Sequence, residues 1–98
     1  MISTKERSVL RGKANTLKPL VTVGKGGATE AVVAEIDTAL YHRELVKVAL
    51  LKSCEQTAKE VASVVSEALG ADVVQCIGNK AVFYRLSEKE GIEHVSLC

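Results

Sequence analysis

The fold is decided by ten residues, Leu-Val-Thr-Val-Gly-Lys-Gly-Gly-Ala-Thr at positions 20–29. The first four are an apolar, largely β-branched run, which predicts a short strand. Three glycines among the next four end that strand, and Thr29 has the residue type of a helix N-cap. We expect a helix from there to about His42, because apolar residues recur at helical spacing. A strand that leads through a short loop into a helix is a building unit of α/β folds.

The residues before this stretch predict a helix from about Thr4 to Leu17. Ser3 and Glu6 have the spacing of a capping box, which marks the start of a helix. Pro19 ends the helix, because the residue before a proline is biased to an extended conformation. The apolar side of this helix consists of Leu10, Ala14 and Leu17.

The residues after the stretch predict a strand, a helix and two further strands, at residues 45–51, 54–69, 72–77 and 80–85. Ser53 and Gln56 have capping-box spacing at the start of that helix. Gly78 and Asn79 predict a two-residue hairpin turn between the last two strands. The order is therefore α-β-α-β-α-β-β. We expect an α/β fold, a single compact domain with a mixed four-stranded sheet packed with helices.

The chain of 98 residues has the length of one domain. We expect this domain at residues 1–86 and a polar, partly flexible C-terminal tail at residues 87–98. The cysteines Cys54, Cys76 and Cys98 are odd in number and contain no Cys-x-x-Cys pair. They are expected to be reduced thiols of a cytoplasmic protein, with Cys54 and Cys76 packed in the core and Cys98 exposed.

The net charge of the chain is +1 at pH 7, and its pI is near 7.7. Such a total argues against a strongly basic nucleic-acid-binding domain. The charge is unevenly distributed, however. Residues 1–53 carry nine basic and five acidic groups, whereas residues 54–98 carry four basic and seven acidic groups. An asymmetry of this kind indicates a partner for the basic half of the chain.

The glycine-rich segment Gly24, Lys25, Gly26 and Gly27 is a candidate phosphate-binding loop. Glycines let a phosphate approach the backbone, and the N-terminus of the following helix favours an anion. The segment lacks the Gly-Lys-Ser/Thr of a nucleotide P-loop, and Thr29 stands where a dinucleotide fingerprint needs glycine. A plain tight turn and a Gly-x-x-Gly clamp on RNA phosphates both remain open.

Basic residues outside the loop form a second candidate feature. Arg7, Arg11 and Lys18 fall on one stripe of the first helix, either as a solvated face or as a phosphate-binding surface continuous with the glycine segment. Lys47 lies in an apolar strand, on one face with Leu45 and Ala49, where it could also protect a sheet edge. The alternative interpretation of Arg85 is a pair with an acidic neighbour.

The sequence offers no pattern that is typical of an enzyme. His42 and His94 have no cysteine or carboxylate at metal-ligand spacing, and no nucleophile elbow is present. No apolar run is long enough to span a membrane, and the polar start has no signal-peptide core. We therefore expect no catalysis, metal, cofactor, small-molecule substrate or membrane partner.

Several groups of residues together resemble the CRM domain, the YhbY-like RNA-binding family (chloroplast RNA splicing and ribosome maturation). In order, they are Ser3–Lys5, Leu10–Arg11, Leu17–Pro19, Val23–Thr29, His42–Val48, and Val74–Lys80 with Tyr84–Arg85. The resemblance covers about residues 2–86. It implies a fold similar to the C-terminal domain of bacterial translation initiation factor three. It also implies binding to ribosomal RNA or to precursors of the large ribosomal subunit.

The resemblance implies an RNA-binding surface made by the glycine loop and nearby basic residues. Its candidate members are Gly24, Lys25, Gly26, Gly27, Arg7, Arg11, Lys18, Lys47 and Arg85. Replacing Gly24 and Gly27 with aspartate is expected to weaken RNA binding and to leave the fold intact. The tail is acidic on balance, unlike many family tails. The alternative function is a protein-interaction module of a ribosomal or translational complex, and a monomer is the expected oligomeric state.

Overall fold

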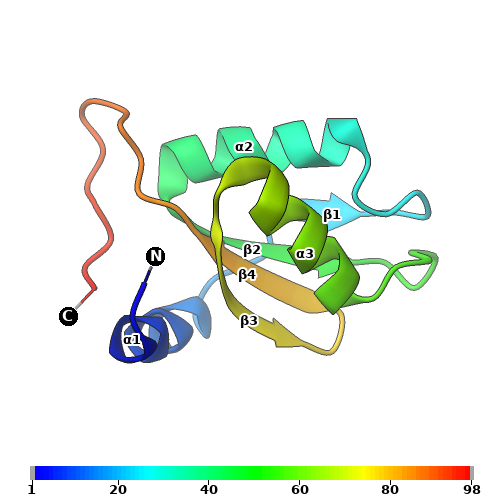
Figure 1. Cartoon of the computed structure of the whole chain (residues 1–98), viewed down its shortest axis with the longest axis horizontal. Coiled ribbons are helices and arrows are strands. Elements are labelled where there is room, and N and C mark those ends of the chain that lie inside the picture. The colour runs from blue at the N-terminus through cyan, green and yellow to red at the C-terminus, as the bar shows by residue number, and fades with distance from the viewer. Residues whose placement is uncertain (1, 98) are drawn as a thin grey trace.

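A computed structural model describes residues 2–97 of the chain, and Figure 1 shows their arrangement. Its elements are α1 (Thr4–Ala14), β1 (Val21–Val23), α2 (Glu30–Arg43), β2 (Leu45–Leu50), α3 (Ala58–Leu69), β3 (Asp72–Ile77) and β4 (Lys80–Tyr84). The predicted order α-β-α-β-α-β-β in a single compact domain is thereby confirmed. Cys98 lies outside the described residues, so its predicted exposure stays a prediction.

The four strands form one mixed sheet in the order β1-β2-β4-β3, so β1 and β3 are its two edges. β1 runs parallel to β2, whereas β4 is antiparallel to both β2 and β3. The turn at Gly78 and Asn79 connects β3 to β4 as predicted, and the Asn79 amide donates a 2.9 Å hydrogen bond to the carbonyl of Leu50. The mixed sheet predicted from the element order is therefore present.

Helices cover both faces of the sheet (Figure 1). α2 and α3 lie on one face, over a core that includes Val46, Val48 and Phe83. α1 lies on the other face, where Leu10 and Ala14 pack with Leu45 and residues of β3 and β4. Successive side chains of β2 therefore point to opposite faces of the sheet, as the two-residue period of a strand requires. Two separate cores on one sheet make the arrangement three-layered.

The start of α1 follows the prediction. Ser3 and Glu6 form the capping box, because the Ser3 hydroxyl accepts from the N–H of Glu6 (3.1 Å) and the Glu6 carboxylate accepts from the N–H of Ser3 (2.8 Å). The helix ends at Ala14 rather than at Leu17. A turn continues the chain, with the N–H of Leu17 donating to the carbonyl of Ala14 (3.0 Å). Leu17 still packs against the α1 side of the core.

The start of α3 differs from the prediction. The capping box is made by Thr57 and Glu60, whose side chains accept from each other's backbone N–H groups at 3.2 and 2.9 Å. The predicted box at Ser53 and Gln56 is wrong, and α3 begins at Ala58. Both pairs have the same spacing, so local sequence does not distinguish them. The side chain of Gln56 is instead engaged elsewhere in the fold.

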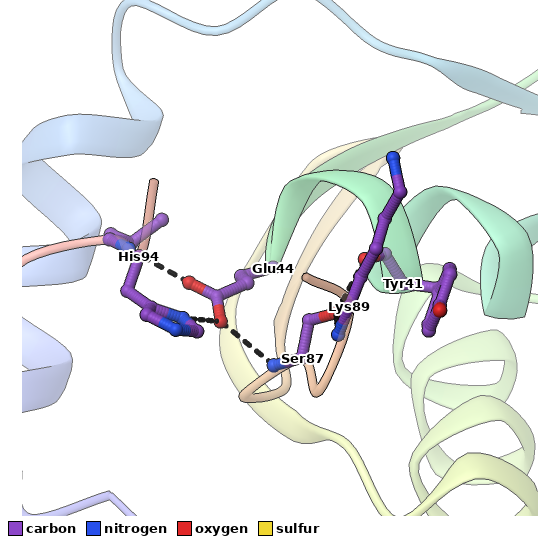
Figure 2. A network of polar contacts seen from close by, with 6 residues as sticks. Tyr41, Glu44, Ser87, Lys89 and His94 are labelled. Atoms are coloured by element: carbon purple, nitrogen blue, oxygen red, sulfur yellow. Dashed lines mark hydrogen bonds and ion pairs between the residues drawn. The ribbon is translucent and has the colours of Figure 1, made fainter. Parts of the chain in front are cut away.

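The segment after β4 is joined to the domain by one buried carboxylate. Glu44 is fully buried, and it accepts hydrogen bonds from the N–H groups of Ser87 and Val95, both 2.8 Å long, and lies 2.7 Å from Nδ1 of His94 (Figure 2). Val95 and Leu97 also pack against the core on the α1 side. The domain boundary at residue 86 and the flexibility of the tail stay predictions, but the segment makes these contacts without forming a helix or strand.

Candidate functional site

The segment between β1 and α2, residues 24–28, is called the glycine loop below. The N–H of Gly27 donates to the carbonyl of Gly24 (3.0 Å), and the N–H of Thr29 donates to the carbonyl of Gly27 (2.9 Å). Thr29 caps α2, because its hydroxyl accepts from the N–H of Val32 at 3.3 Å. The predicted order of a strand, a glycine-rich loop and a helix capped by Thr29 is therefore confirmed.

Gln56 holds the glycine loop in place. Its side-chain oxygen Oε1 accepts a 2.8 Å hydrogen bond from the N–H of Ala28, although the two residues are 28 positions apart. The same carboxamide occupies the space where a side chain at Gly27 would have to lie. Gly27 also has a φ of +70°, in the left-handed region that glycine adopts at little cost. From the sequence Gln56 was expected to be a helix-capping residue. A contact between residues 28 positions apart leaves no spacing pattern that could have predicted its actual role.

The two glycines of the Gly-x-x-Gly pattern differ in their surroundings. Gly27 is buried, and both its backbone conformation and its contact with Gln56 require the absence of a side chain. Gly24 has no positive φ, and a Cβ built there would find no atom within 4 Å. The fold therefore requires glycine at Gly27 and leaves open space at Gly24.

The tip of the glycine loop presents free hydrogen-bond donors. Lys25 and Gly26 are exposed, and within residues 2–97 their backbone N–H groups donate to no protein acceptor. The ammonium of Lys25 likewise has no ion pair within that range. Adjacent N–H groups and a lysine beside a helix N-terminus are donors that suit a phosphate group.

Arg7 and Arg11 contact the edge strand β3. Nε of Arg7 donates to the carbonyl of Val73 (3.2 Å), and Nε of Arg11 donates to the carbonyl of Val74 (3.3 Å). The register of β3 against β4 shifts between Val73 and Gln75, as in a β-bulge. The two arginines thus cover the edge of the sheet at an irregular point, where free carbonyls would otherwise invite pairing.

The basic stripe of α1 does not adjoin the glycine loop. Arg7 and Arg11 contact β3 at one edge of the sheet, whereas the glycine loop follows β1 at the other edge (Figure 1). The expectation of one continuous surface from sequence proximity is therefore corrected. Helix α1 carries its apolar side to the face opposite α2, which moves its arginines away from the loop. Lys59 of α3, which no sequence motif singled out, lines the same space as the arginines.

Lys47 lies in β2 on the α1 side of the sheet, and Lys18 lies in the segment that precedes β1. Lys47 is half-buried and pairs with Val82, which belongs to the core on that side. Its carbonyl accepts from the N–H of Leu20 (2.9 Å), which ties it to the segment that carries Lys18. Lys18 is exposed. Lys47 therefore adds a cation on the face that α2 and α3 do not cover, and Lys18 adds an exposed one in the segment before β1.

Arg85 makes the acidic pair that the sequence left open as its alternative. Its guanidinium lies 2.8 Å from the carboxylate of Asp37 in α2, and it donates to the carbonyls of Leu69 and Asp37, both at 3.2 Å. These contacts join α2 to the C-terminal end of α3. Arg85 therefore has a structural task, and we do not include it in the RNA surface proposed below.

The described part of the chain shows no candidate metal site. Residues 2–97 contain no group of three metal-ligating side chains and no helix able to cross a membrane. His94 is engaged by Glu44, and His42 contacts the ring of Tyr41 edge-on. Burial raises the pKa of the Cys76 thiol, which disfavours its reactive thiolate form. Cys54 and Cys76 pack against the core as predicted.

Comparison with known proteins gives consistent results over the whole domain. The model of the CRS1/YhbY (CRM) domain family matches residues 2–85. The "Probable RNA-binding protein YqeI" of Bacillus subtilis is 38% identical over 89 residues, which cover 91% of this chain and 93% of that protein. An "RNA-binding protein" of Haemophilus influenzae is 39% identical over 92 residues, covering 94% and 93%.

A solved structure shows the same fold. The solution structure of a hypothetical protein from Staphylococcus aureus matches with a TM-score of 0.79 and 38% sequence identity. The match covers 92% of this chain and 94% of that one. The likeness therefore extends over more than nine-tenths of both chains.

Proposed function

The chain belongs to the CRS1/YhbY (CRM) domain family, and from this premise we propose that it binds RNA, specifically structured ribosomal RNA during assembly of the large ribosomal subunit. Relatives that match over more than nine-tenths of the chain are named as RNA-binding proteins, which supports RNA as the ligand class. The ribosomal target rests on the resemblance described from the sequence. A protein with this task works in the cytoplasm and requires no catalytic group.

The observation that carries the proposal is the exposed tip of the glycine loop. The N–H groups of Lys25 and Gly26 and the Lys25 ammonium are donors without a protein partner in the described chain. The open space at Gly24 lets a phosphate approach the backbone closely. Since Gln56 fixes the base of the loop, these donors are held in position before RNA arrives. Such preorganisation reduces the entropy lost on binding.

Further cations extend the proposed surface. Lys47 lies on the α1 side of the sheet, Lys18 lies exposed in the segment before β1, and Arg7 and Arg11 lie at the β3 edge. Contacts with phosphates give affinity that depends on salt, and they carry no base sequence. Within residues 2–97 Phe83 and Tyr84 are buried and Tyr41 is the one exposed tyrosine or phenylalanine ring, so these residues form no platform of several rings for base stacking. The proposed selectivity therefore comes from RNA shape.

The test measures binding of the purified protein to a structured fragment of large-subunit ribosomal RNA at several salt concentrations. Three to five phosphate contacts give a slope of about −2 to −3.5 in a plot of log K against log salt concentration. Gly24→Asp is expected to weaken binding severalfold, because it places a carboxylate against the phosphate. Ala34→Asp, on the exposed side of α2, adds the same charge away from the loop and is the matched control.

The outcome also separates the proposal from the alternative of a protein-interaction module. A slope near zero for the wild type, or equal affinities for Gly24→Asp and Ala34→Asp, would remove the loop from any RNA site. Binding to a ribosomal protein in the absence of RNA would then favour the alternative.

A further inference from the structure

A groove lies at the outer edge of the sheet, between α1, α3 and β3. It has a volume of about 500 Å³, and both helices contribute polar side chains to its walls. The residues that matter for its chemistry are Arg7, Arg11, Lys59, Ser63, Gln75 and Cys76. This groove is separate from the glycine loop, which follows the strand at the opposite edge.

The charge of the groove has one sign. Arg7, Arg11 and Lys59 line it, and no aspartate or glutamate does. Across residues 2–97, ion pairs are formed by Arg85 with Asp37 and by His94 with Glu44, so all three groove cations are without a carboxylate partner. Like charges that converge on a concave surface favour an anion there.

The two arginines are oriented by the strand. Each uses Nε to donate to a carbonyl of β3, at Val73 and Val74, which fixes one edge of the planar guanidinium. The Nη groups of both arginines donate to no acceptor within the described chain. A guanidinium with free Nη groups binds phosphate oxygens in a planar, bidentate manner.

These contacts also argue against a protein strand as the occupant. A partner strand that paired with β3 would have to displace the arginine side chains from the carbonyls of Val73 and Val74. Charged side chains at an edge strand are a common means of preventing such pairing. A polyanion satisfies the cations without disturbing those bonds.

The first turn of α3 joins the groove to the glycine loop. Gln56 contacts Ala28 in the loop, Thr57 caps the helix, and Lys59 lines the groove three residues after Gln56. A nucleic-acid strand that leaves the glycine loop along this turn therefore reaches the groove.

We propose that the groove between α1, α3 and β3 binds the phosphate backbone of the same RNA that contacts the glycine loop, with Lys59 as the link between the two sites. The inference rests on the proposed RNA-binding function and names the path of the RNA across the protein. It assigns the ligand to Arg7, Arg11 and Lys59 together.

The experiment compares Lys59→Ala with Lys13→Ala and Lys25→Ala, using the ribosomal RNA fragment and the salt series described above. Lys59 and Lys13 are both exposed, but Lys13 lies outside the groove and is the matched control. Removing one phosphate contact reduces the steepness of the salt slope by about 0.7. We expect this reduction, with severalfold weaker binding, for Lys59→Ala and none for Lys13→Ala. The double variant of Lys25 and Lys59 should lose about 1.4.

Two failures are distinguishable. If the wild type binds with a steep slope and Lys25→Ala weakens it, but Lys59→Ala matches the wild type, the groove proposal is overturned and the glycine-loop function stands. If the wild type has a slope near zero, the proposed function fails and the groove proposal fails with it. Thermal unfolding followed by circular dichroism confirms that each variant is folded.

Discussion

Gln56 and Ala28 are joined by a hydrogen bond of 2.8 Å, from the backbone N–H of Ala28 to Oε1 of Gln56. The bond connects the loop before α3 to the glycine loop. The two loops lie at the same end of the sheet because β1 and β2 are parallel, so the segments that follow them leave side by side (Figure 1). The shape of the candidate site therefore depends on a residue outside the Gly-x-x-Gly motif.

The first prediction concerns this bond. Gln56→Ala is expected to lower the free energy of unfolding by about 0.5–1.5 kcal/mol, the usual net contribution of one hydrogen bond. The amide of Ala28 should exchange with solvent faster, and RNA affinity should fall because the loop is less ordered. Urea denaturation and amide hydrogen exchange measure the two effects. Thr38→Ala, which removes a local hydrogen bond on the exposed side of α2, is the control, and unchanged exchange at Ala28 would contradict the prediction.

The second prediction separates the two paired glycines. Gly27→Ala should lower the free energy of unfolding by about 1–3 kcal/mol, because a side chain there meets Gln56 and disfavours the left-handed backbone. Gly24→Ala should change it by less than about 1 kcal/mol. This corrects the expectation that both glycines can be replaced without harm to the fold. Equal melting curves for the two variants would refute it.

The third prediction concerns the pH dependence of stability at Glu44. Burial by itself would raise the pKa of this carboxyl, but hydrogen bonds from Ser87, His94 and Val95 outweigh it and lower the pKa. A lowered pKa in the folded state stabilises the fold above the unfolded value of about 4.3, and that stabilisation is lost as the pH falls through the folded value.

The corresponding variant is Glu44→Gln, which keeps the shape and removes one acceptor. We expect it to cost about 1–3 kcal/mol at pH 7, because a buried N–H group of Ser87 or Val95 loses its partner. Denaturation from pH 7 to pH 3 should show the difference from the wild type shrinking below about pH 4.3. A difference that is constant with pH would show that the charge of Glu44 is unimportant.

The fourth prediction distinguishes Arg85 from Lys47. Arg85→Ala should lower the free energy of unfolding by about 1–2 kcal/mol, because it removes two hydrogen bonds and a partly exposed ion pair with Asp37. It should leave the salt dependence of RNA binding unchanged. Lys47→Ala should leave the free energy of unfolding nearly unchanged and make the salt slope less steep by about 0.7. A reduced slope for Arg85→Ala would return Arg85 to the RNA surface.

Local chemistry was sufficient to predict the elements. The capping box of Ser3 and Glu6, the N-cap at Thr29 and the turn at Gly78 act between residues a few positions apart, so their spacing is visible in the sequence. The element order then restricted the sheet to a mixed one. Prediction failed at the start of α3, where Ser53 with Gln56 and Thr57 with Glu60 offered equal spacing.

The candidate site was predictable only in part. The glycine loop follows from its composition, because glycines between a strand and a helix predict a backbone that a ligand can approach closely. The positions of Arg7 and Arg11 could not be predicted in this way, because they depend on which face of the sheet α1 covers. The groove with Lys59 arises because β3, the sixth element in the chain, lies beside the first.

The sequence by itself determined the order of the helices and strands, the glycine loop between β1 and α2, and the concentration of basic residues in the first half of the chain. Only the tertiary structure decided that Gln56 holds the loop, that Arg85 pairs with Asp37, and that the arginines of α1 and the loop lie at opposite edges of the sheet. The physical reason is the separation along the sequence between the residues that interact. Caps and turns depend on neighbours within a few residues, whereas these contacts form between segments that packing of the two cores brings together.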